Sequence, residues 1–131
     1  MADRRGISGR ALARLDNTLG VPTFILNKAI SGAATTLVVD NAPFKFRVLD
    51  AWSIGTSADG GNWKVTKIDP ADGSTVRDII SDVTQATSDK DIDRAADVDD
   101  AYYDISQGED LTIVSTGASL SCTVFILCAR V

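Results

Sequence analysis

The acidic stretch from residue 82 to residue 110 holds the side chains whose spacing best suits metal chemistry. Counted from Asp89, carboxylates fall at positions 1, 3, 5, 9 and 12, five of the positions that carry oxygen ligands in the calcium loop of an EF-hand. The stretch departs from that motif at position 6, where Arg94 replaces glycine, and at position 12, where Asp100 replaces the bidentate glutamate. The calcium candidates are Asp89, Asp91, Asp93, Asp97 and Asp100.

Two other interpretations of this stretch stay open. It contains ten acidic residues against Lys90 and Arg94, a net charge of −8. Self-repulsion among these charges could simply keep a loop in solvent. Alternatively, the carboxylates could form a contact surface for a basic partner, such as an arginine-rich segment of another copy of the chain.

Catalysis is disfavoured by what the chain lacks. There is no histidine, so the commonest general base and Ser–His–Asp or Cys–His catalysis are absent. The glycine-rich segment 55–61 has no Lys-Ser/Thr ending for phosphate binding. Cys122 and Cys128 share one apolar run, where an extended strand holds them about 20 Å apart, too far for a disulfide. We therefore expect buried free thiols, no catalytic residue and no cofactor.

The two tryptophans bear on the choice between core and surface functions. Trp52 has the core-facing register of its strand, so we expect it in the core. Trp63 follows a glycine-rich loop and opens a strand. It could stack on a sugar ring or fill a pocket of a partner, although packing in the core or at its rim is the plainer expectation.

Charge divides the chain into an arm and a body. The net charge is −5 and the pI about 4.5, which disfavours general nucleic-acid binding. Residues 1–20 carry a net +2, and Ser8–Leu19 could form a short helix with three leucines on one face. Residues 1–21 are therefore predicted to be an arm that orders on a partner, with a frayed terminus or a helix packed on its own core as alternatives. Its candidate partner-binding residues are Arg4, Arg5, Arg10, Arg14, Leu12, Leu15 and Leu19.

The body, residues 22–131, has the two-residue apolar rhythm of β-strands. Strands are predicted at 24–26, 35–39, 44–54, 63–69 with 74–80 as a hairpin, 111–116 and 120–129. The last run is apolar on both faces, so we expect it to be central and covered on both sides. Residues 27–34 are predicted to be a turn or loop, and 81–100 a surface excursion with one helical turn near 91–96. About eight strands without intervening helices indicate an all-β, antiparallel, jelly-roll-like sandwich.

Neither end of the chain suggests a membrane. The basic N-terminus has no apolar segment after it of the kind found in signal peptides, and no apolar run approaches about 18 residues. We expect a protein that is made in a cytosol and does not contact membranes.

Several of these segments resemble small jelly-roll decoration (cement) proteins of tailed bacteriophages. The matching features are the arm with Arg4-Arg5, Arg10 and Arg14, the strand Phe46–Ile54, the hairpin that starts at Trp63, and the ending from Gly108 through Leu127. The resemblance covers roughly residues 22–131 and is one of general pattern.

The resemblance implies a non-catalytic virion protein on the capsid surface, assembled in the host cytoplasm. It implies that the major capsid protein is its partner and that the protein is a homo-oligomer, trimer or dimer. A carbohydrate- or host-binding β-sandwich module, as in a head fibre or spike, is the alternative. That module would use Trp63, Tyr102 or Tyr103 at its surface.

Overall fold

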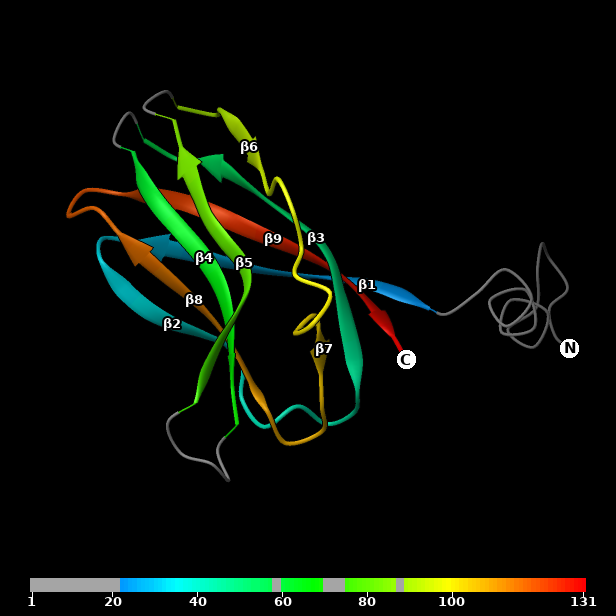
Figure 1. Cartoon of the computed structure of the whole chain (residues 1–131). Helices are drawn as coiled ribbons and strands as arrows, with labels where there is room; N and C mark the ends of the chain where they lie inside the picture. The colour runs from blue at the N-terminus through cyan, green and yellow to red at the C-terminus, as the bar shows by residue number, and fades with distance from the viewer. Residues whose placement is uncertain (1–21, 58–59, 70–74, 87–88) are drawn as a thin grey trace, which may run out of the picture.

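The computed structural model describes residues 22–57, 60–69, 75–86 and 89–131, and all regular structure in these ranges is β-strand. Nine antiparallel strands form two sheets that pack face to face (Figure 1). The first sheet contains, in order, β1 (Thr23–Ser31), β9 (Ser121–Arg130), β3 (Phe46–Gly55) and β6 (Ile92–Arg94), with β7 (Asp104–Ile105) pairing elsewhere on β3. The second sheet contains β2 (Ala34–Val39), β8 (Asp110–Thr116), β4 (Gly61–Ile68) and β5 (Val76–Gln85).

The strand order is that of a jelly roll. The orders β1-β9-β3-β6 and β2-β8-β4-β5 arise when the chain passes repeatedly from one sheet to the other. The all-β, antiparallel sandwich predicted from the apolar rhythm is thus confirmed. The described residues form nine strands, one more than the eight or so expected, because the short β6 and β7 both add to β3. Within these ranges no helix has the length and apolar character needed to span a bilayer.

The core lies between the two sheets. Val48, Val124 and Ile126 of the first sheet are buried, as are Val65 and Ile113 of the second. Strict alternation along β9 places every second side chain in this core, as period-two burial requires. The strands predicted at 111–116 and 120–129 are confirmed as β8 and β9, and β9 is central in its sheet.

The predicted loop at residues 27–34 is wrong over most of its length. β1 continues to Ser31 because β9 provides a partner of matching length, and the two strands stay in register as far as Ser31 and Ser121. The turn is confined to residues 32–33, where Gly32 takes a φ of +70° that favours glycine.

The predicted core position of Trp52 is also wrong. The register of β3 against β9 shifts between Val48 and Asp50, which inserts one extra residue into β3. Before this bulge the even-numbered side chains face the core, and after it the odd-numbered ones do, so Ala51 and Ser53 are buried. Trp52 consequently lies on the outer face of the first sheet.

The predicted excursion at residues 81–100 is only partly correct. β5 extends to Gln85, and the predicted helical turn near 91–96 is wrong because β6 occupies 92–94. The segment after β6 follows the edge of β3, where Ala95 N donates to the Ala51 carbonyl at 2.9 Å and Val48 N donates to the Tyr103 carbonyl at 2.8 Å. Backbone groups of β3 that need partners therefore hold this acidic segment against the sheet.

Candidate interaction surface

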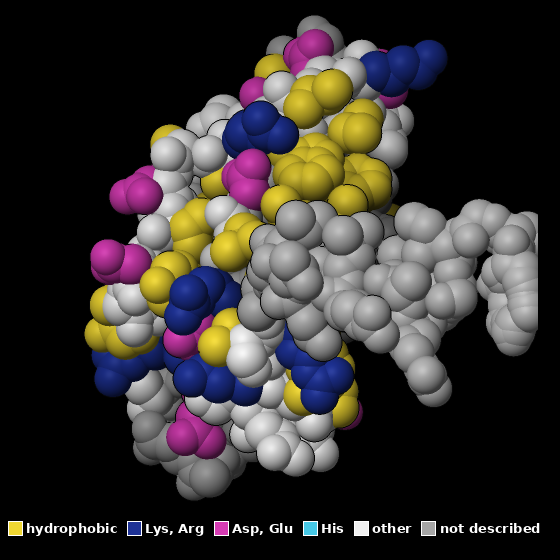
Figure 2. Space-filling view, turned by 90° about the vertical axis from the view of Figure 1, so that its right-hand side faces the viewer, with side chains coloured by type: hydrophobic (Ala, Val, Ile, Leu, Met, Phe, Trp, Pro, Cys, Tyr) yellow, Lys and Arg dark blue, Asp and Glu magenta, His cyan; other side chains and the backbone are white. Residues whose placement is uncertain are grey.

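The outer face of the first sheet carries an apolar patch. Cross-strand pairing places Ile25 beside Leu127, Trp52 beside Phe125, and Ile54 beside Ile92, all on this face. Ile25 is 52% and Ile92 68% exposed, and the other four side chains are half-buried. Figure 2, which looks at the right-hand side of Figure 1, shows apolar side chains gathered there between basic and acidic ones. We call these six residues the outer patch.

The centre of the outer patch is a pair of aromatic rings. Trp52 and Phe125 stack with ring centroids 5.8 Å apart and planes 11° from parallel. The Arg94 guanidinium lies over Trp52, with Cζ 5.7 Å from the ring centroid, and its Nε is 3.3 Å from Asp50 Oδ2. Tryptophan, arginine and large apolar side chains around one centre are typical of the residues that dominate protein–protein binding.

The outer face of the second sheet is different. There Thr66 and Thr112 form a hydrogen bond across β4 and β8, and Lys64 Nζ is 3.3 Å from Asp78 Oδ2. Val76, at 50%, and Leu37, at 44%, are the large apolar side chains most exposed on this face among the described residues. This face therefore has exposed aliphatic side chains but, among the described residues, no aromatic centre like the Trp52–Phe125 stack.

The strand β9 explains why the sequence did not indicate this surface directly. Its two apolar faces predicted cover on both sides, but only the face with Val124 and Ile126 is buried. Phe125 and Leu127, on the other face, are half-buried, and no described residue forms a layer over them. The described residues therefore provide no cover for the outer face of β9. A central strand that is apolar on both faces was the sequence feature that could have indicated an interaction surface here.

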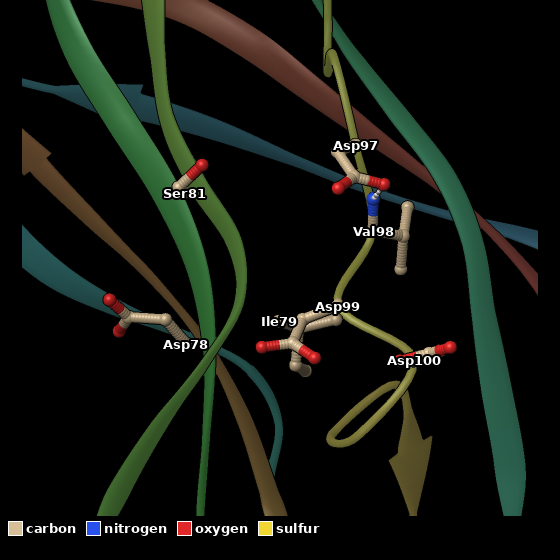
Figure 3. A pocket seen from close by; sticks show the side chains of 7 residues that line it. All are labelled: Asp78, Ile79, Ser81, Asp97, Val98, Asp99 and Asp100. Atoms are coloured by element: carbon tan, nitrogen blue, oxygen red, sulfur yellow. Dashed lines mark hydrogen bonds between the residues drawn. The ribbon is translucent and has the colours of Figure 1, made fainter.

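A groove of about 500 Å³ separates β5 from the segment that follows β6 (Figure 3). Its lining residues are Asp78, Ile79, Ser81, Asp97, Val98, Asp99 and Asp100. The two walls are joined by the hydrogen bond from Asp99 N to the Ile79 carbonyl, 2.8 Å long. The groove is therefore an acidic depression along the edge of the second sheet.

The carboxylates of this region do not converge on one point. In Figure 3 the side chains of Asp78 and Asp100 point to opposite sides. Asp97 Oδ1 accepts a hydrogen bond from Val98 N and Asp99 Oδ1 accepts one from Ala101 N, at 2.8 and 2.9 Å. These contacts use carboxylate oxygens for local backbone geometry.

The calcium candidates are likewise spread along the chain. Asp91 directly precedes β6 and Asp93 lies within it, so an extended backbone replaces the tight loop of an EF-hand. Asp93 Oδ2 accepts a hydrogen bond from Ala86 N at 2.8 Å. In the ranges that the structure describes, no three Asp, Glu, Cys or His side chains lie close enough together to hold a metal ion. The structure does not assemble the five candidates into a site.

The aromatic residues proposed for a sugar-binding module are buried or restricted by neighbouring side chains. Trp63 is completely buried, which confirms the core expectation and removes the alternative role. Tyr102 and Tyr103 are half-buried, and the guanidinium carbons of Arg77 and Arg47 lie 5.2 and 4.4 Å from their ring centroids. Sugar stacking needs an open ring face, which these contacts restrict.

An ion pair joins β3 to β7 beside Tyr103. Arg47 Nε donates to Asp104 Oδ1 at 2.7 Å and a second guanidinium nitrogen donates to Oδ2 at 3.3 Å. This fork-like contact lowers the pKa of Asp104 and raises that of Arg47. The ion pair therefore holds the C-terminal end of the acidic segment, at β7, against the first sheet.

The two cysteines are buried free thiols, as expected. Both face the core from β9, and burial raises the pKa of Cys122 to about 11 and that of Cys128 to about 12. Thiolates are the reactive form of cysteine, so neither residue is suited to nucleophilic chemistry at neutral pH. The predicted partner-binding residues of the arm lie outside the described residues.

Comparison with known proteins adds little to this geometry. No family model matches the chain, and no curated protein sequence matches it. Among solved structures, Eiger TNF from S. frugiperda matches with 12% identity and a TM-score of 0.47, over 84% of this chain and 93% of that one. A chain in the structure of infectious bursal disease virus Gx strain matches with 15% identity and a TM-score of 0.47, over 85% of this chain and 32% of that one. Likenesses this distant carry no argument about function.

Proposed function

We propose that this protein is a non-catalytic structural component of a virion that binds the outside of a phage capsid and cements neighbouring major capsid subunits. The observation that carries the proposal is the outer patch, an apolar sheet face centred on the Trp52–Phe125 stack. The resemblance of the sequence to phage decoration proteins supplies the kind of partner. No step of this function needs a catalytic group.

The physical basis is the burial of apolar surface on a preformed platform. The strands β1 and β3 that carry much of the outer patch are paired along their length with β9, so little conformational entropy is lost when a partner covers them. Each contact is of modest size, and many copies that bind neighbouring subunits gain strength through multivalency. The basic arm, residues 1–21, would add contacts between its arginines and carboxylates of the capsid.

Co-sedimentation with empty shells of the major capsid protein encoded in the same genome tests the proposal. Trp52→Ala removes the centre of the outer patch, and we expect the apparent Kd for the shells to rise at least tenfold. The control is Leu37→Ala, which removes an exposed apolar side chain from the outer face of the other sheet and should change the Kd less than threefold. Equal binding by a folded Trp52→Ala variant, or no binding by the wild type, would contradict the proposal.

The arm is tested separately in the same assay. Deleting residues 1–20 should abolish shell binding and leave the melting temperature of the β-sandwich nearly unchanged, because the described core draws on residues from Phe24 onward. Undiminished binding by the truncated protein would assign the contact to the outer patch alone.

A further inference from the structure

The first sheet ends in an edge strand that lacks the usual protection. β1 has nine residues, contains no proline, and has Lys28 as its single charged residue. Its register against β9 runs without a bulge from Thr23 to Ser31. Long, regular and weakly charged edge strands offer a row of hydrogen-bonding groups to another strand, and most proteins avoid them.

The other three edges of the sandwich do carry such protection. β6 has three residues, two of them charged. β2 has six residues and a register irregularity between Leu37 and Val39. β5 contains Arg77, Asp78 and Asp82 and pairs irregularly with β4. Its Ile79 carbonyl also accepts a hydrogen bond from Asp99 N. Protection is thus missing at β1 alone among the described edges.

The backbone groups on the open side of β1 can be identified. Arg130 N donates to the Pro22 carbonyl at 3.0 Å, and Gly32 N donates to the Leu120 carbonyl at 2.7 Å. Because bonded and non-bonded pairs alternate along an antiparallel ladder, the even-numbered residues of β1 bond to β9. The odd-numbered ones therefore direct their N–H and C=O groups away from the sheet: Thr23, Ile25, Asn27, Ala29 and Ser31. None of these groups has a hydrogen bond to another described residue.

We propose that β1 pairs with β1 of a second copy, antiparallel and about a two-fold axis at Asn27. Asn27 is the central residue of the strand, so this register pairs all nine residues. A two-fold axis through a residue always pairs odd-numbered positions with odd-numbered ones, so the groups that lack partners bond to each other. Ile25 then faces Ala29 of the second copy, and Lys28 faces Leu26, which avoids opposing charges.

The proposed pairing also extends the outer patch. An antiparallel neighbour related by an axis perpendicular to the sheet presents the same face on the same side. Ile25 lies on the outer face at the β1 edge, and the two outer patches would thus become one apolar band across a ten-stranded sheet. This dimer does not depend on the proposed function, since it uses the backbone N–H and C=O groups of β1, whereas the proposed capsid contact uses side chains of the outer face.

Light scattering on the full chain at micromolar concentration tests the pairing. We expect a mass of about twice 13.9 kDa for the wild type. Asn27→Pro removes an N–H that points away from β9, so the variant should keep its β-sheet circular dichroism and dissociate at least tenfold more readily. A wild-type monomer or trimer, or an Asn27→Pro variant as dimeric as the wild type, would overturn the proposal.

Cross-linking tests the register without relying on proline. In the proposed dimer the two Asn27 Cα atoms lie about 5.5 Å apart, within disulfide range, so Asn27→Cys should form a covalent dimer on mild oxidation. The matched control is Thr23→Cys, on the same face and equally exposed, whose copies would lie about 26 Å apart and should not cross-link. Cys122 and Cys128 are buried and give little background. Equal cross-linking of the two variants, or none, would refute this register.

Discussion

The indole N–H of Trp63 donates a hydrogen bond to the hydroxyl of Ser53 at 3.0 Å, and both side chains are fully buried. The Ser53 hydroxyl in turn donates to Gln85 Oε1, which is also buried. Ser53 belongs to the first sheet and its two partners to the second. The three side chains thus form a polar bridge through the core, where each group depends on the others for its hydrogen bond.

Removing the central hydroxyl should be costly. In Ser53→Ala the buried Trp63 N–H and the buried Gln85 oxygen both lose their partner, so we expect the free energy of unfolding to fall by about 3 kcal/mol. Ser81→Ala, an exposed serine on β5, is the matched control and should change it by less than about 0.5 kcal/mol. Urea denaturation measures both. Equal stabilities would show that the bridge contributes nothing.

The Arg47–Asp104 pair predicts a loss of stability in acid. Because its folded-state pKa is lowered by Arg47, the Asp104 carboxylate stabilises the fold fully above its unfolded pKa. That contribution decreases as pH falls from about 4 through the folded-state value. The difference in unfolding free energy between wild type and Asp104→Asn should therefore shrink on acidification below about pH 4. A difference that stays constant from neutral pH into acid would exclude this linkage.

Both thiols should resist labelling in the folded state. With pKa values of about 11 and 12 and side chains in the core, Cys122 and Cys128 contain almost no accessible thiolate at pH 8. We expect a thiol reagent such as Ellman's reagent to react with neither in buffer and with both in denaturant. Rapid reaction of a native thiol would mean that β9 opens readily, and the surface variant Thr23→Cys provides the positive control.

Calcium should leave the stability of the protein unchanged. The five aspartates that the EF-hand comparison singled out do not form a common site in the described residues, so we expect no shift in melting temperature with millimolar calcium. Asp91→Ala should behave like the wild type in the same titration. A calcium-dependent rise in the wild type that the variant loses would re-establish the metal hypothesis.

Strands could be predicted from the sequence where side chains alternate regularly between the core and the outer face and the register with one partner strand has no bulge. β8 and β9 satisfy both conditions, and the hairpin of β4 and β5 does so except at its register irregularities. The prediction failed at β3, where one extra residue near Leu49 reverses the side on which later side chains lie. A bulge depends on pairing with β9, and single-strand periodicity carries no record of it.

The candidate interaction surface, too, could be predicted from the sequence only in part. The sequence alone determined that the chain builds a histidine-free β-sandwich and that one run near its C-terminus is apolar on both faces, since composition and period-two alternation are local properties. Only the tertiary structure decided that Trp52 faces outward beside Phe125, that the outer face of β9 has no cover among described residues, and that β1 is an open edge. Those facts depend on strand order and register, which are set by contacts between residues far apart in the chain.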